Sequence, residues 1–117
     1  MNSTIDVINK RIDLGEVRVP GTRVYSGQPR GKAARQHFRV DSLDREEGVV
    51  TVLIPSDTYS IGPSFLLGLF EPSIIKLGED RFFAKYKFPW DTILLDSLHE
   101  TVARATKTST VLRSIAS

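Results

Sequence analysis

The chain has no cysteine, and this absence removes several classes of site. Disulfide bonds and thiolate chemistry are excluded, which fits a reducing compartment. Histidine is almost as scarce, because His37 and His99 are the only two in the sequence. A zinc site would need both of them together with carboxylates from distant segments, so the sequence predicts no bound metal.

Long apolar runs are also missing from the sequence. No run approaches the roughly 20 apolar residues that a membrane-spanning helix needs. Residues 1–8 lack a basic start and a long apolar segment, so no signal peptide is expected. We therefore predict a cytoplasmic protein that does not partner with a membrane.

Acidic residues are absent from residues 17–39, although the whole chain carries a net charge of only +2. The basic residues of this stretch are Arg18, Arg23, Arg30, Lys32, Arg35 and Arg39. The pattern predicts a local basic surface, on which Arg30, Lys32, Arg35 and Arg39 would bind nucleic acid or another polyanion. A solvated face with no ligand is the alternative interpretation.

Length and composition indicate one domain. The chain has 117 residues, of which 40% are hydrophobic and 26% are charged, as in ordinary globular proteins. Because the sequence turns polar from Lys107 onward, we expect a single α/β domain over residues 1–107. Residues 108–117 would form a C-terminal tail that frays.

The stretch VVTVLIPSDTYSIGPSFLLGLF at 49–70 organises the predicted fold. Residues 49–54 are apolar or β-branched without a polar face, which is typical of a strand covered on both faces. Gly62 and Pro63 then predict a helix start, and apolar residues recur through Phe70 as on a helix that lies on a sheet. Residues 49–70 are therefore predicted to form a strand, a loop and a helix, in that order.

The remaining elements follow from local patterns. The expected elements are two short antiparallel strands within 5–19, a helix over 30–43, a short helix at 73–77 started by Pro72, a helical turn at 79–84, a strand at 85–88 and a helix from residue 91 or 92. Alternation of strands and helices predicts an α/β fold with a mixed sheet of about four strands and helices packed on it.

No constellation of catalytic groups stands out. Ser64, Asp96 and His99 contain the residue types of a hydrolytic triad. However, Asp96 and His99 lie three residues apart on a well-patterned helix, and no G-x-S-x-G nucleophile elbow is present. We predict a protein that is not an enzyme and that uses no cofactor.

A series of short motifs occurs in the following order over most of the chain: Ser26-Gly27, Ala34-Arg35, Phe38-Arg39, the apolar strand, Gly62-Pro63-Ser64-Phe65-Leu66, Phe70, Lys76-Leu77-Gly78 and the strand from Lys85 to Phe88. This order resembles the STAS-like domain family of unknown function. That family is similar in fold to STAS domains, which include anti-sigma-factor antagonists. The resemblance implies a regulatory domain that docks another protein, such as a kinase-like or histidine-kinase-like ATPase.

In STAS antagonists the loop before the matching helix carries Asp-Ser-Ser/Thr-Gly, and phosphorylation of the second hydroxyl residue abolishes partner binding. Ser64 takes the place of that residue here, while Gly62, Pro63 and Phe65 replace the other three. The resemblance therefore implies Ser64 as a candidate phosphoacceptor. Simple hydrogen bonding at the helix start is the alternative role for Ser64 and Ser60.

Two hypotheses about function follow. The first is a non-enzymatic, STAS-like domain that docks a partner protein through the loop and helix at 57–70, with Asp57, Tyr59, Ser60 and Ser64 as binding residues. The second is a small basic domain that binds nucleic acid or another polyanion through residues 17–39. A phage protein of the second kind would interfere with a host complex.

Overall fold

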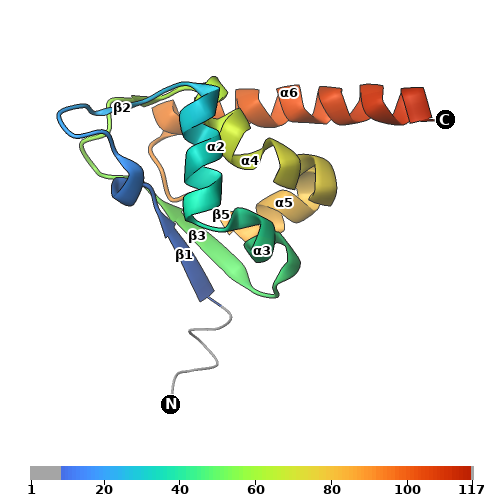
Figure 1. Ribbon diagram of the computed structural model, residues 1–117, viewed down its shortest axis with the longest axis horizontal. Coiled ribbons are helices and arrows are strands. Elements are labelled where there is room, and N and C mark those ends of the chain that lie inside the picture. Colours follow the sequence, from blue (N-terminus) through green and yellow to red (C-terminus); the bar gives the residue numbers. More distant parts are fainter. Residues whose placement is uncertain (1–8, 117) are drawn as a thin grey trace, which may run out of the picture.

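The computed structural model describes residues 9–116 and confirms an α/β fold (Figure 1). In chain order the elements are strand β1 (Asn9–Asp13), the 3₁₀ helix η1 (Leu14–Val17), β2 (Val24–Tyr25), α2 (Gln28–His37), α3 (Val40–Arg45), β3 (Val49–Leu53), β4 (Ser60–Ile61), α4 (Pro63–Leu77), α5 (Glu79–Lys85), β5 (Tyr86–Lys87) and α6 (Thr92–Ala116).

The strands form two sheets rather than one. The larger sheet has the order β1-β3-β5 with β3 in the centre, and β2 pairs with β4 separately. All of these pairings are parallel. The predicted mixed sheet of about four strands is thus wrong. Helices connect the successive strands of the larger sheet, and such crossovers return the chain in the same direction.

The larger sheet has one well-covered face. Ile12, Val50, Val52 and Tyr86 point to this face, and each is at most 1% exposed. Residues 49, 51 and 53 point the other way and are only partly buried. The prediction that 49–54 forms a strand is confirmed over Val49–Leu53, but the expectation that both faces are fully covered is wrong.

The N-terminal part differs from the predicted antiparallel strand pair. Residues 5–8 of that prediction lie outside the described residues. Residues 9–13 form β1, which runs parallel to β3, and the chain then turns into η1. Asp13 caps η1, because its carboxylate accepts a hydrogen bond of 2.9 Å from the Gly15 N–H. This local cap ends the strand where alternation suggested that extended structure would continue.

The helix predicted over 30–43 is two helices. Arg39 between them has φ 52° and ψ 51°, the left-handed conformation that a side chain disfavours. The break turns α3 away from the axis of α2, and it allows Asp41 and Asp44 of α3 to meet Arg35 of α2. The helix that starts at Pro63 was predicted to end before Pro72, with a separate short helix at 73–77. Instead, one helix, α4, continues through Pro72 to Leu77, because Ser73 and Ile74 beyond the proline are buried.

Helices α2 and α4 cross at two glycines. A Cβ atom on Gly31 would lie 2.9 Å from the carbonyl carbon of Phe65 and nearer still to its oxygen. A Cβ on Gly68 would lie 2.8 Å from the backbone nitrogen of Lys32. Carbon atoms do not approach so closely, so the crossing requires glycine on both helices.

An aromatic cluster fills the core between the sheet and the helices. Phe70 of α4 lies 5.3 Å from Phe82 and 5.2 Å from Tyr86 between ring centroids. The cluster continues through Phe88, whose centroid lies 5.1 Å from that of Trp90. Trp90 donates a hydrogen bond of 2.8 Å from Nε1 to the Val52 carbonyl, which fixes the indole on the central strand.

Helix α6 is the longest element and packs on α4. Its buried apolar side chains are Leu94, Leu98, Val102 and Ala105, which belong to the predicted apolar pattern, whereas Leu95 of that pattern is only partly buried. Thr101 and Ser109 are buried as well. The helix runs without a break past residue 107, so the predicted boundary between domain and tail falls inside it. Its C-terminal end extends beyond the other helices (Figure 1).

Candidate functional site

The loop before α4 belongs to a lobe that pairs two distant segments, residues 18–25 and 55–62; we call it the Tyr59 lobe. Strands β2 and β4 join the segments with Val24 opposite Ser60 and Tyr25 opposite Ile61. Backbone bonds extend the pairing, from Tyr59 N–H to Arg23 O (2.7 Å) and from Gly62 N–H to Tyr25 O (2.8 Å). The loop is therefore held along its length rather than only at its ends.

An ion pair closes the outer part of the Tyr59 lobe. The two terminal guanidinium nitrogens of Arg18, Nη1 and Nη2, donate to the Asp57 carboxylate at 2.8 and 2.9 Å, and Arg18 Nε donates to Thr22 O at 2.6 Å. Hydrogen bonding from Arg18 holds the pKa of the Asp57 carboxyl below its usual range. Asp57, a predicted partner-binding residue, is thus already engaged by a residue that sequence reasoning did not single out.

Tyr25 anchors the Tyr59 lobe on the core. Its hydroxyl donates to Leu14 O at 2.9 Å, and its ring lies 5.3 Å from that of Phe65. Burial raises the pKa of the Tyr25 phenol. The outer surface is different, because Tyr59 is 75% exposed and Val24 is 42% exposed. The lobe therefore presents an aromatic side chain on a fixed backbone.

The start of α4 lies at the surface, as the sequence predicts. Gly62 is the N-cap, no side chain caps the helix, and Pro63 occupies its first turn. Ser64 is exposed, whereas Ser60 is partly buried in β4. The structure thus places Asp57, Tyr59 and Ser60 together on the Tyr59 lobe, with Ser64 at the start of the adjoining helix.

The body of α4 is not part of this surface. Phe65, Leu66, Leu69 and Phe70 are each at most 2% exposed. The prediction that the helix through residue 70 contributes to docking is therefore wrong for its apolar side chains, because the core and α6 cover them. Of the residues predicted to bind a partner, Asp57 and Tyr59 on the loop and Ser64 in the first turn of the helix are exposed.

The predicted polyanion-binding residues divide between two places. A cleft of about 500 Å³ lies between α2, α3 and α4. Its lining residues are Gln28, Lys32, Arg35, Gln36, Arg39, Asp41, Ser42, Leu67, Gly68, Glu71 and Pro72. Arg30 lines a separate pocket of about 170 Å³ beside Val24. The carboxylates of Asp41 and Glu71 also line the larger cleft, so the basic residues do not form one continuous cationic surface.

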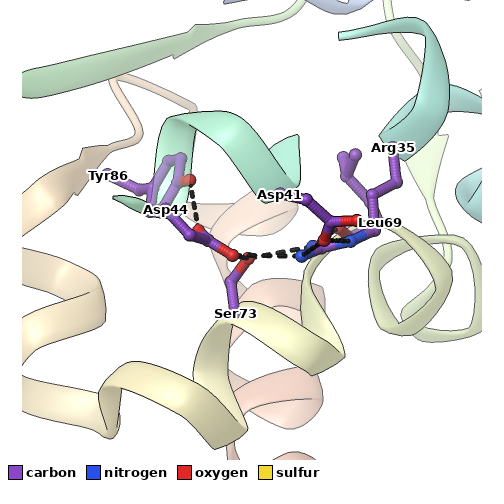
Figure 2. Close-up of polar contacts among 6 residues, drawn as sticks. All are labelled: Arg35, Asp41, Asp44, Leu69, Ser73 and Tyr86. Atoms are coloured by element: carbon purple, nitrogen blue, oxygen red, sulfur yellow. Dashed lines mark hydrogen bonds and ion pairs between the residues drawn. The ribbon is translucent and has the colours of Figure 1, made fainter. Parts of the chain in front are cut away.

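Arg35 is the main correction to the predicted basic surface, because it is buried and fully engaged. Figure 2 shows its guanidinium between α3 and α4. It donates to Asp41 Oδ1 (2.6 Å) and Asp44 Oδ2 (3.0 Å) of α3, and to Leu69 O (2.8 Å) and Ser73 Oγ (2.9 Å) of α4. Arg35 thus joins three helices and is not available to an external anion.

Asp44 is the centre of this network (Figure 2). Its side chain is 0% exposed and accepts bonds from Ser73 Oγ (2.7 Å) and Tyr86 Oη (2.6 Å) besides Arg35. Burial, followed by the hydrogen bond to Asp44, raises the pKa of the Tyr86 phenol, so Tyr86 remains a proton donor. A buried carboxylate needs such partners, since without them its desolvation would be very costly.

The triad considered from the sequence is not assembled among the described residues. No hydrogen bond connects Ser64, Asp96 and His99 in residues 9–116, and the His99 ring stacks on Phe83 at 6.3 Å. Within the same residues, no group of three or more histidine, cysteine, aspartate or glutamate side chains could hold a metal ion.

The sequence did not reveal the contacts of Arg18, Asp44, Ser73 and Tyr86. The Arg18–Asp57, Asp44–Ser73 and Asp44–Tyr86 contacts join residues that lie 29 to 42 positions apart along the chain, although Arg35 and Asp44 are only nine residues apart. Between residues 9 and 116, no helix is both long and apolar enough to cross a bilayer.

Comparison of the chain with family models, curated proteins and solved structures found no match in any of the three.

Proposed function

We propose that the protein is a non-enzymatic binding module that docks another protein through the outer surface of the Tyr59 lobe and the first turn of α4. One observation carries the proposal: Tyr59 is 75% exposed on a loop whose backbone is fixed by β2 and by the Arg18–Asp57 pair. Large exposed aromatic residues on ordered loops are typical anchors of protein interfaces.

The fixed backbone favours binding in a second way. Association normally costs free energy to order loops and side chains, and a loop already held in one conformation avoids much of that cost. The bidentate pair of Arg18 and Asp57 therefore supports binding from within the lobe, rather than by contacting the partner directly. Truncation of an anchoring tyrosine typically costs about 2 kcal/mol or more of binding free energy.

Ser64 offers a site of regulation for the same surface. It is exposed in the first turn of α4, where a kinase could reach it and where a negative charge suits the helix dipole. Phosphorylation would accordingly leave the helix intact and change the charge of the docking surface. The resemblance to STAS domains favours an anti-sigma-type regulator or a histidine-kinase-like ATPase as the partner class.

Affinity capture with the purified full chain tests the proposal. We expect the wild-type chain to retain a kinase-like or ATPase partner, Tyr59→Ala to lose at least about 30-fold in affinity, and Ser64→Asp to weaken binding while Ser64→Ala does not. Arg81→Ala is the control, because it shortens an exposed side chain on α5, away from the Tyr59 lobe. Equal binding by wild type and Tyr59→Ala would refute the proposal.

A further inference from the structure

The charges of α6 are divided between its two halves. Asp96 and Glu100 are the acidic residues of the helix, and both precede its basic residues Arg104, Lys107 and Arg113. This order suits the helix dipole. It also makes the helix electrostatically complementary to a second copy of itself that runs in the opposite direction.

One side of α6 carries a stripe that no described element covers; we call Ile93, Glu100, Arg104 and Val111 the α6 stripe. The spacings of seven, four and seven residues place these side chains on one side of the helix. Ile93 is 77% exposed and Val111 is 52% exposed. The side chains of Glu100 and Arg104 are 52% and 54% exposed and form an ion pair of 2.7 Å along the helix.

We propose that α6 pairs antiparallel with α6 of a second copy of the chain through this stripe. The two-fold axis would cross the stripe midway between Glu100 and Arg104, at the height of residue 102 along the helix. In this register Ile93 lies opposite Val111 of the second copy, and Glu100 lies opposite Arg104. The two-fold symmetry makes each contact twice. The two Glu100–Arg104 pairs would then merge into a network of four charges, flanked at both ends by apolar contacts.

The charge order selects this arrangement over the alternatives. Parallel helices would place Glu100 beside Glu100 and Arg104 beside Arg104. An antiparallel register shifted by one turn would place one of these residues opposite its own copy. Like charges that face each other across an interface repel. The register centred on residue 102 instead places each charge of the stripe opposite a charge of the other sign.

The length of the stripe sets the expected strength. Residues 93 to 111 span about 27 Å of helix at 1.5 Å per residue. One pair of helices in contact over this length forms an interface at the low end of stable sizes, so we expect a reversible dimer with a Kd in the micromolar range. Because its central contacts are exposed ion pairs, salt should weaken it. The inference does not depend on the proposed function of the Tyr59 lobe.

Charge reversal followed by mixing tests the pairing. In Glu100→Arg, positions 100 and 104 both carry a positive charge, and in Arg104→Glu both carry a negative charge. Each variant alone should be monomeric by sedimentation velocity at concentrations where the wild-type chain dimerises. An equimolar mixture of the two variants should form a heterodimer, because every central contact is then between opposite charges. The double variant Glu100→Arg/Arg104→Glu should dimerise like the wild type.

The mixture separates pairing between chains from effects within one helix, since both single variants lose the ion pair along α6. Arg113→Glu is the matched control; it lies nine residues from Arg104, on the opposite side of the helix, and should leave the dimer unchanged. A wild-type chain that stays monomeric at all concentrations overturns the proposal. A dimer that persists in both single variants also overturns it, because the contact would then use another face.

Discussion

Replacing Gly31 with alanine should destabilise the fold through the crossing of α2 and α4. The new Cβ would lie 2.9 Å from the Phe65 carbonyl carbon, whereas ordinary contacts begin at 3.4 Å, so the helix backbones must separate by at least 0.5 Å. Arg35 resists that movement, because it ties α2 to the carbonyl of Leu69 at 2.8 Å, about one turn farther along α4. Overpacking of this kind costs about 1–3 kcal/mol, and a clash with backbone belongs at the upper end.

Alanine is about 1 kcal/mol more favourable than glycine in the interior of a helix, and this gain offsets part of the cost of the clash. The net loss should therefore be about 2 kcal/mol, which corresponds to a fall of about 8 °C in Tm for a chain of this size. Thermal and urea unfolding followed by circular dichroism would measure it.

Gly62→Ala provides the matched control for this experiment. Gly62 has φ −80° and ψ 150°, which alanine adopts readily, and a Cβ there would lie 3.6 Å from its nearest neighbour, Tyr25 O. Its Tm should fall by much less than that of Gly31→Ala. A Gly31→Ala chain that melts within about 2 °C of the wild type, or a Gly62→Ala chain that loses as much stability, would contradict this prediction.

Two further predictions concern buried and exposed carboxylates. Asp44→Ala should lower the free energy of unfolding by about 3–5 kcal/mol, because it removes the buried counter-charge of Arg35 and leaves the Ser73 and Tyr86 hydroxyls without their acceptor; urea unfolding would measure this, and a loss below about 1 kcal/mol would contradict the role given to the network. The second prediction follows from the lowered pKa of Asp57 beside Arg18. The ionised, paired carboxylate stabilises the fold above the ordinary pKa of about 3.8, and this contribution should be lost as the pH falls through the lower folded-state pKa. A carboxyl titration by NMR should show the lowered value in the wild type and a normal one in Arg18→Gln; an unchanged value in the variant would assign the shift to another cause.

Local patterns in the sequence predict part of the fold well. The central strand, the glycine–proline start of α4 and the apolar face of α6 are confirmed, because each depends on residues within a few turns of one another. The α/β class follows from their order. These features needed no knowledge of distant partners.

Other features depend on partners that the sequence does not reveal. The parallel pairing of β1 is set by β3, about 40 residues later, so a short alternating segment alone suggested a hairpin-like arrangement. The left-handed conformation of Arg39 is maintained by tertiary contacts of the helices on either side. Pro72 remains helical because burial of the following turn outweighs the local cost of a proline.

The candidate sites show the same division. A loop at the surface before α4 was predictable from Gly62 and Pro63, and Tyr59 could be identified within it. The engagement of Asp57 by Arg18 and the burial of Arg35 could not, because a charged residue in a basic stretch looks the same in the sequence whether it faces solvent or an internal carboxylate.

The position of Trp90 gives the protein a built-in spectroscopic reporter. It is the only tryptophan in the chain, it is 8% exposed, and its indole N–H is bonded to the middle strand of the larger sheet. Its emission should therefore shift to longer wavelength only when the indole leaves that strand for water. Intrinsic fluorescence would thus follow opening of the hydrophobic centre without any attached dye, while the exposed ring of Tyr59 lies at the outer surface.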